Sequence, residues 1–89
     1  MAEPTTFARL SVLIVDHLDI DFERIKPEAL FTADFGADSL DYIELLIAAE
    51  GAFDIEISDA DAEACQTVAQ AVETLDRLIA QQHPKAAHG

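Results

Sequence analysis

Ser39 is the residue whose surroundings best suit a chemical role. It stands inside the string Gly-Ala-Asp-Ser-Leu-Asp at positions 36–41. Gly36 allows the backbone to turn tightly, and Asp38 and Asp41 can cap a helix that begins here. A phosphate ester on the Ser39 hydroxyl would meet free backbone N–H groups and the positive end of the helix dipole. The pattern therefore suits a phosphoester attachment site. The alternative interpretation is that the same residues form only a helix cap.

Two other chemistries fit the sequence poorly. A serine hydrolase would need a Gly-x-Ser-x-Gly turn around Ser39, and no motif links this serine to the histidines at positions 17, 83 and 88. The acids after position 53 suggest a calcium loop, but such a loop requires Gly at its sixth position and Glu at its twelfth. This chain has Asp59 and Cys65 there. Catalysis by this chain and a true calcium loop are disfavoured, no firm metal site is predicted, and weak divalent binding by crowded carboxylates remains open.

The single cysteine, Cys65, is predicted to be a buried structural residue. The charged residues near it in the sequence are acids, whereas a reactive thiol needs positive charge nearby to stabilise its thiolate. One cysteine cannot form an intramolecular disulfide. This fits a reducing compartment, and we expect a cytoplasmic location.

The charge of the chain narrows its partners. Eighteen acidic residues against five basic ones give a formal net charge of −13, and no Lys, Arg or His interrupts the thirteen acids from Glu28 to Asp76. Such a surface repels nucleic acid and anionic membranes and attracts basic proteins or cations. We therefore expect no nucleic-acid binding. The simpler alternative is that the acids only keep the chain soluble.

The hydrophobic pattern predicts an all-α fold. Eighty-nine residues, 51% of them hydrophobic, suit one small domain, and apolar residues recur at helical spacing while Gly and Pro are scarce. Helices are expected over residues 5–18, 39–53, 59–64 and 67–80. The longest apolar runs fall far short of the roughly 20 residues that a membrane helix needs, so no membrane insertion is expected.

A long connection, residues 19–35, joins the first two predicted helices. Connections of this length are unusual unless they are ordered or functional. Its apolar residues suggest that it packs down onto the helices; these are Ile20, Phe22, Ile25, Leu30 and Phe31.

The second predicted helix carries apolar residues on two faces. At about 100° per residue, one face contains Tyr42, Leu45, Leu46, Ala49 and Phe53 and is expected to join the core. The opposite face contains Leu40, Ile43 and Ile47 among acids. Either this helix is covered on both sides, or the second stripe is an exposed protein-docking surface. Small residues nearby, Ala49, Ala64 and Cys65, predict room for a guest chain beside this helix.

The string around Ser39 resembles the attachment motif of acyl carrier proteins, which is usually written Leu-Gly-Ala-Asp-Ser-Leu-Asp. The resemblance extends from about Leu10 to Ile79 without gaps. It includes Phe31-x-x-Asp34-Phe35-Gly36, Ile43-Glu44-Leu45, the segment Phe53-Asp54-Ile55-Glu56-Ile57-Ser58-Asp59, and Thr67-Val68. The chain departs from the family pattern in having Phe35 for leucine, Ser58 for proline, Gly51 and Ala52 for frequent acids, and Cys65 for an aliphatic residue.

The resemblance implies a four-helix bundle with a short third helix and a long first loop. It implies a stand-alone carrier domain over residues 1–82, expected to be monomeric, with a flexible tail over 83–89. A phosphopantetheinyl transferase would move 4'-phosphopantetheine from coenzyme A to Ser39, and Asp38 would contact the magnesium ion or the transferase during loading. The arm would carry acyl groups as thioesters, so the chain itself would not be an enzyme.

The partners implied are the transferase and acyl-processing enzymes with basic docking patches. The docking surface beside Ser39 is predicted to comprise Leu40, Asp41, Ile43, Glu44, Ile47 and Glu50. Fatty-acid or related lipid synthesis is the expected pathway, and Gly51 and Ala52 suggest a specialised carrier. Two alternatives remain open: a carrier for polyketide, aryl or amino-acyl units, and an acidic helical interaction module that is never modified.

Overall fold

The computed structural model describes residues 5–84 and is all-helical over that range. Its α-helices are α1 (Thr6–Leu18), α2 (Ser39–Phe53), α3 (Asp59–Ala64) and α4 (Val68–Gln82), and a 3-10 turn, η1 (Phe22–Arg24), lies in the first loop. No strand occurs among the described residues; an isolated bridge pairs Leu30 with Thr67. The predicted all-α, four-helix fold with a short third helix is confirmed. No helix in the described range is long and apolar enough to span a membrane.

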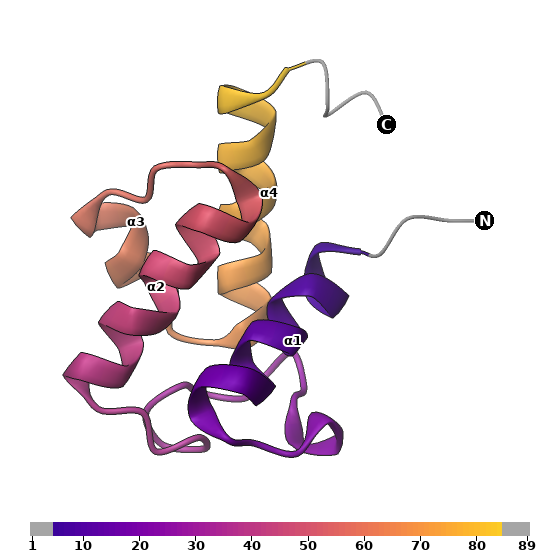
Figure 1. Ribbon diagram of the computed structural model, residues 1–89, viewed down its shortest axis with the longest axis vertical. Coiled ribbons are helices and arrows are strands. Elements are labelled where there is room, and N and C mark those ends of the chain that lie inside the picture. Colours follow the sequence, from indigo (N-terminus) through magenta and orange to yellow (C-terminus); the bar gives the residue numbers. More distant parts are fainter. Residues whose placement is uncertain (1–4, 85–89) are drawn as a thin grey trace.

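Three long helices enclose the core, and α3 lies at its side. α1 packs against α2 and α4, while α3 packs against α4 (Figure 1). The Thr5 hydroxyl caps α1 by accepting a hydrogen bond from the Ala8 amide at 3.1 Å. The buried core contains residues from every long helix and from the loop; its members include Leu10, Ile14, Phe31, Leu45, Phe53, Val68, Leu75 and Leu78.

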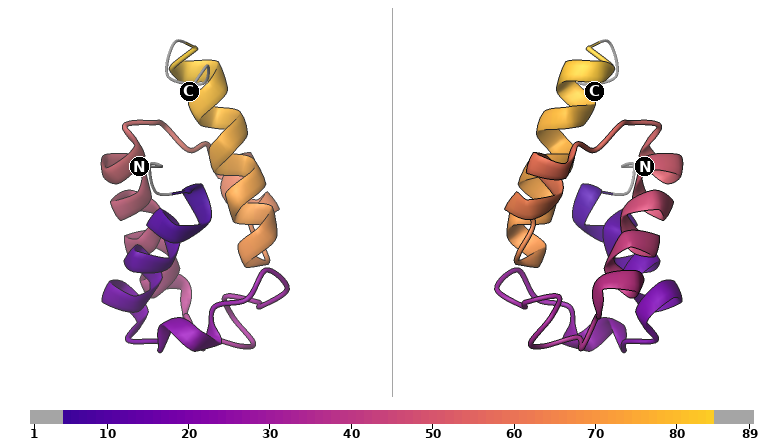
Figure 2. Two further views of the ribbon diagram at one scale, coloured as in Figure 1. Left: turned by 90° about the vertical axis from the view of Figure 1, so that its right-hand side faces the viewer. Right: turned by 90° about the vertical axis from the view of Figure 1, so that its left-hand side faces the viewer.

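The long loop is ordered and closes one end of the bundle (Figure 2). It is fastened to the start of α4, where the Val68 amide donates to the Ala29 carbonyl at 3.0 Å and the Ala69 amide donates to the Pro27 carbonyl at 2.8 Å. Ile20, Ile25 and Phe31 are buried, as predicted. The loop therefore positions the segment that leads into α2.

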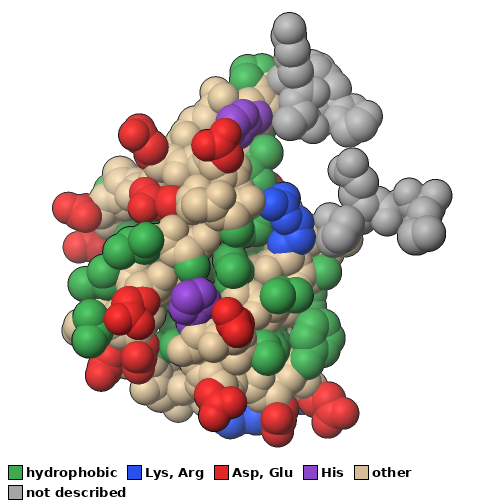
Figure 3. Space-filling model, in the orientation of Figure 1, with side chains coloured by type: hydrophobic (Ala, Val, Ile, Leu, Met, Phe, Trp, Pro, Cys, Tyr) green, Lys and Arg blue, Asp and Glu red, His purple; other side chains and the backbone are tan. Residues whose placement is uncertain are grey.

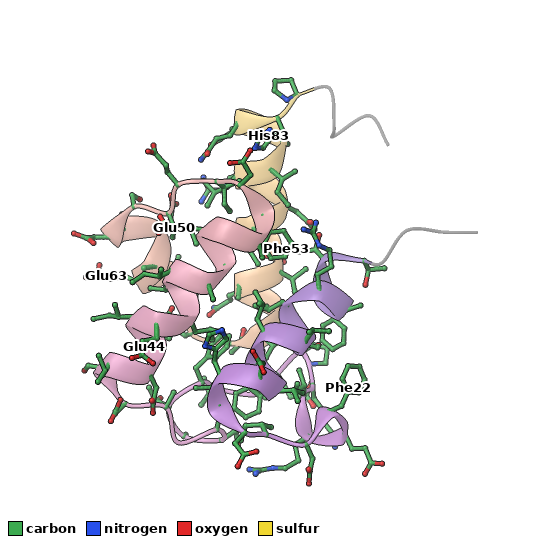
Figure 4. The ribbon with its side chains drawn as sticks, in the orientation of Figure 1. Phe22, Glu44, Glu50, Phe53, Glu63 and His83 are labelled. Atoms are coloured by element: carbon green, nitrogen blue, oxygen red, sulfur yellow. The ribbon has the colours of Figure 1, made fainter. Side chains whose placement is uncertain are left out.

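Two loop residues were expected to pack inward and do not, so the prediction is wrong for Phe22 and Leu30. Phe22 is 56% exposed and Leu30 is 37% exposed. η1 contacts α1 on one side, and Phe22 points away from the helices in Figure 4. Leu30 instead contributes backbone: its amide donates to the Asp34 carboxylate at 2.6 Å and helps to form the next turn.

α4 ends at Gln82, two residues beyond the predicted end at Ala80. The Gln82 side chain holds this last turn, because it accepts from the Glu56 amide at 2.9 Å and donates to the Glu56 carbonyl at 3.0 Å. His83 is the first residue of the predicted tail, and its ring contacts the Asp54 carbonyl. Pro84 follows in an exposed turn, and residues 85–89 of the predicted tail lie outside the described residues.

Candidate functional site

A tight turn places Ser39 at the first position of α2. Gly36 has a φ of 66°, a left-handed conformation that favours glycine. The Gly36 amide donates to the Thr32 carbonyl at 3.0 Å, and the Ala37 amide donates to the Phe31 carbonyl at 3.1 Å. These bonds compact the turn, so that α2 starts directly above the loop.

A capping box fixes the start of α2. The Asp38 carboxylate accepts from the Asp41 amide at 2.8 Å, and the Asp41 carboxylate accepts from the Asp38 amide at 3.4 Å. The capping role predicted for both residues is confirmed. Reciprocal bonds of this kind satisfy amides that a helix start leaves without partners. Asp41 is consequently engaged in the cap, and the residue is only partly exposed.

Aromatic side chains pack against each other on the buried side of the turn that precedes Ser39. The rings of Phe31 and Phe35 meet edge to face with centroids 5.9 Å apart, and both residues are buried. Phe35 fills the position where the family pattern has leucine, and its ring gains this aromatic contact. Arg24 donates to the Asp34 carbonyl at 2.7 Å on the outer side of the turn.

Ser39 is exposed and lines an open groove of about 670 Å³ between α2 and α3. The groove is bordered by α2, by α3 and by the loop; its other lining residues are Phe31, Thr32, Ala37, Asp38, Tyr42, Ile43, Leu46, Asp59, Ala62, Glu63, Cys65 and Gln66. The first turn of a helix presents N–H groups and a positive dipole end to a phosphate. The arrangement can therefore hold a phosphoester on Ser39, with space beside it for an attached chain.

The outward face of α2 is an exposed apolar stripe. Leu40, Ile43 and Ile47 are 64%, 51% and 61% exposed. In Figure 3, hydrophobic side chains and carboxylates intermingle along this side of the molecule. Of the two predicted possibilities, α2 is therefore covered on its inward face alone within the described part of the chain.

The acids of the predicted docking surface differ in their availability. Glu44 is exposed and points outward from α2 in Figure 4. Glu50 is only partly exposed, because its carboxylate accepts from the Ile57 amide at 2.8 Å and ties α2 to the connection that follows. The sequence did not reveal this internal role of Glu50. Glu44 is the acid of this helix that a partner reaches most readily.

Tyr42 joins α2 to the end of α3. Its hydroxyl lies 2.7 Å from the Ala62 carbonyl and 2.8 Å from the Cys65 carbonyl, and it donates to this pair. The last carbonyls of a helix have no partner within that helix; here the Ala62 carbonyl accepts from the Cys65 amide at 3.1 Å, and Tyr42 adds a second bond to the end of α3. Burial, with a smaller effect of Cys65, raises the pKa of Tyr42 to about 12. The helical pattern placed Tyr42 on the core side of α2, but nothing in the sequence indicated its bonds to α3.

α3 is capped at its start as well. Ser58 stands where the family pattern has proline, and its hydroxyl accepts from the Asp61 amide at 3.1 Å. Asp61 also forms an ion pair with Arg77 of α4. The hydrogen bond from Arg77, followed by that from Ser58, lowers the pKa of Asp61. The short helix is thus tied to α4 and to the site at once.

Cys65 is buried, as predicted. Its thiol donates to the Asp61 carbonyl at 3.2 Å, and burial raises its pKa. A raised pKa keeps the thiol protonated and weakly reactive at neutral pH. In residues 5–84 no three His, Cys, Asp or Glu side chains are grouped so that they could hold a metal ion.

A comparison with known families matches this region. Residues 8–75, more than half of the chain, fit a family model described as a phosphopantetheine attachment site. The matched segment runs from α1 into α4 and contains the capped turn, Ser39, the groove and the outward face of α2.

Proposed function

The chain belongs to the family of acyl carrier protein-type domains, which carry covalently bound 4'-phosphopantetheine, and from this membership we propose that the arm is attached to Ser39 and shuttles acyl intermediates. The observation that carries the assignment is the exposed Ser39 at the first position of a helix whose start is fixed by reciprocal caps. A carrier of this family is not itself a catalyst. When bound, the arm supplies a thiol that forms thioesters with acyl groups.

Loading requires only a nucleophilic oxygen from this chain. The Ser39 Oγ forms the phosphoester bond, coenzyme A loses its nucleotide half as the pyrophosphate bond breaks, and the serine proton leaves to the phosphopantetheinyl transferase. The helix start then stabilises the negative charge that remains beside Ser39. Asp38 holds the turn rigid through its cap, and its exposed carboxylate can contact the transferase or its magnesium ion.

We propose that partner enzymes dock on the outward face of α2. Leu40, Ile43 and Ile47 supply apolar contact next to Ser39, where an enzyme must reach the arm. Glu44 supplies negative charge that steers basic patches toward this face. Weak and salt-sensitive docking suits a carrier that visits several enzymes in succession. Asp41 and Glu50 contribute mainly negative electrostatic potential and not direct contacts to a partner, because their carboxylates accept hydrogen bonds from backbone amides.

The proposed pathway is fatty-acid or related lipid synthesis, with a specialised set of partners. Gly51 and Ala52 are both exposed at the far end of α2, where acids are frequent in fatty-acid carriers. Their neutrality leaves the end near Ser39 as the more charged part of the helix. A monomer in the cytoplasm is proposed as its working state, and the lone buried Cys65 agrees with a reducing compartment.

Intact-protein mass spectrometry tests the attachment. Wild type, Ser39→Ala and Ser58→Ala are incubated with a promiscuous phosphopantetheinyl transferase, coenzyme A and magnesium. Ser58 is the matched control, since it is also an exposed serine at the start of a helix. We expect wild type and Ser58→Ala to gain the mass of one arm and Ser39→Ala to gain none. An arm on Ser39→Ala would refute the site, and no arm on wild type would favour an unmodified interaction module.

A further inference from the structure

The groove beside Ser39 and the interior of the core are separate spaces. The interior contains an apolar cavity of only about 20 Å³, bordered by Leu10, Phe31, Tyr42, Leu45, Leu46, Ala49, Cys65, Ala71 and Leu75. That volume is close to what one water molecule requires, about 10–15 Å³. The core as it stands therefore has no space for an acyl chain, although Ala49 and Cys65 lie there as predicted; Ala64 is exposed instead.

Tyr42 stands at the boundary between the two spaces. It borders the groove and the cavity, together with Phe31, Leu46 and Cys65. Tyr42 is the member of this set whose side chain crosses from α2 to α3, through its bonds to the two carbonyls at the end of α3. Its ring also packs against Phe31, with centroids 5.8 Å apart.

Moving Tyr42 aside would carry several costs at once. The phenol has one proton and shares it between the carbonyl oxygens of Ala62 and Cys65. The Ala62 carbonyl would keep the bond from the Cys65 amide at 3.1 Å, and the Cys65 carbonyl would lose the bond from Tyr42. The half-buried ring would lose its contact with Phe31. α3 is only six residues long and would lose the side-chain part of the cap at its C-terminal end. The closed position is therefore the one that the neighbouring structure supports.

We infer that Tyr42 is a specificity-determining residue, which closes the passage from the groove into the core and keeps the attached acyl group in the groove. This inference rests on the proposed attachment at Ser39. The groove offers the apolar surfaces of Ile43 and Leu46 together with the polar groups of Thr32, Glu63 and Gln66. Short acyl groups or acyl groups with hydrogen-bonding substituents fit such a lining, and long saturated chains find no apolar interior. The cargo class inferred for this carrier is accordingly short or polar acyl groups, which narrows the proposed lipid synthesis to steps that handle such groups.

The chain offers a direct optical probe of this device. Tyr42 is the only tyrosine and there is no tryptophan, so tyrosine fluorescence reports on this residue alone. Wild type is loaded from acetyl- and octanoyl-coenzyme A by a promiscuous transferase, and intact mass confirms each product. Thioester hydrolysis at fixed pH, melting temperature and tyrosine fluorescence are then compared for the two chain lengths.

For wild type we expect both thioesters to hydrolyse at rates within about twofold, with unchanged melting temperature and fluorescence, because a chain outside the core neither gains protection nor stabilises the fold. In Tyr42→Ala the octanoyl thioester is expected to hydrolyse at least about three times more slowly than the acetyl thioester. The reason is that the opened core shelters the longer chain. Tyr42→Phe keeps the ring without the bonds to α3. Its ratio of acetyl to octanoyl hydrolysis rates should lie between the ratios of wild type and Tyr42→Ala. Val12→Ala, on the exposed face of α1 and outside both the groove and the cavity, should behave like wild type.

Slower hydrolysis of the octanoyl thioester in wild type, with a change in tyrosine fluorescence, would overturn the inference. Equal hydrolysis of both thioesters in Tyr42→Ala would overturn it as well, since Tyr42 would then not be the barrier. Tyr42→Phe and wild type decide the matter even if Tyr42→Ala folds poorly. Failure of the proposed function would look different, because wild type would gain no arm before any acyl comparison begins.

Discussion

The two faces of α2 carry similar apolar residues, but one face is buried and the other is exposed. The inward face holds Leu45, Ala49 and Phe53, none of which is more than 5% exposed, and Phe53 reaches into the space between the helices in Figure 4. The outward face holds a leucine and two isoleucines that are each more than half exposed. Residue type therefore does not separate fold from function here. The position of each residue around the helix, relative to α1 and α4, does.

The largest expected effect comes from the inward face. Leu45→Ala should lower the free energy of unfolding by about 2–5 kcal/mol, because it removes buried methyl groups and leaves a cavity. Urea or thermal unfolding of the unloaded protein measures this loss. Ile43→Ala, on the outward face, is the matched control and should change stability by less than about 0.5 kcal/mol. Equal losses in the two variants would contradict the division between the faces.

The next effect should appear in loading by the transferase. The double variant Ile43→Ala, Ile47→Ala should lower kcat/KM for loading about tenfold, which corresponds to a loss of about 1.4 kcal/mol for the two apolar contacts together. The fold should remain intact by circular dichroism. Val12 is the comparison residue, because it is similarly exposed on α1 at 63%, and Val12→Ala should load like wild type. A loading defect in Val12→Ala would move the docking surface away from α2.

Charge reversal on the outward face should have a smaller effect, and one that salt can mimic. Glu44→Lys should lower kcat/KM for loading about three- to tenfold at low salt, mainly through the association rate. At 0.1 M salt the Debye length is about 10 Å, so the difference from wild type should shrink. Glu73→Lys makes the same charge change on an exposed residue of α4 and should have less effect. If Glu44→Lys loads like wild type at low salt, steering does not come from this face.

Added acids at the far end of α2 should sharpen the comparison between general and specialised carriers. Gly51→Glu and Ala52→Glu should raise kcat/KM with fatty-acid synthesis enzymes by about twofold, because the basic patches of such enzymes gain an attractive charge. Ala52→Gln adds similar bulk without charge and serves as the control. If neither acid changes the kinetics, the neutral residues at these two positions say nothing about partner choice.

The smallest effect concerns pH and the short helix beside the groove. Arg77 and Ser58 lower the pKa of Asp61, so its ionised form is favoured in the folded protein. A lowered pKa gives stability above the unfolded pKa, near 4, and this stability is lost as the pH falls through the folded value. Unfolding free energies of wild type and Asp61→Asn, measured from pH 7 downward, should therefore converge below about pH 4. A difference that grows with acidity would contradict this sign.

The sequence was most informative where structure is set locally. The bounds of α2 and α3 agree with the predicted ones, because Asp38, Asp41 and Ser58 cap these helices with side chains only three residues from their partners. Gly36 marked the turn before Ser39 because its left-handed conformation favours glycine. The start of the site could thus be predicted from short-range chemistry.

Contacts between distant segments could not be predicted in this way. The bond between Gln82 and Glu56 lengthens α4, and the bonds of the Tyr42 hydroxyl join α2 to the end of α3. The bond from Ile57 to Glu50 is likewise invisible in a helical pattern. Each of these depends on how the helices are placed in space, which hydrophobic spacing leaves undetermined.

The central claim is that partner enzymes bind the outward face of α2 around Ser39. An amide chemical-shift titration of the ¹⁵N-labelled Ser39→Ala variant with the transferase tests it most directly, because this variant binds without being loaded. We expect the largest shifts in residues 38–47 and in the groove-lining part of α3, with little change in the exposed residues of α1 around Val12. Shifts centred on α1 or α4, with α2 unperturbed, would contradict the account.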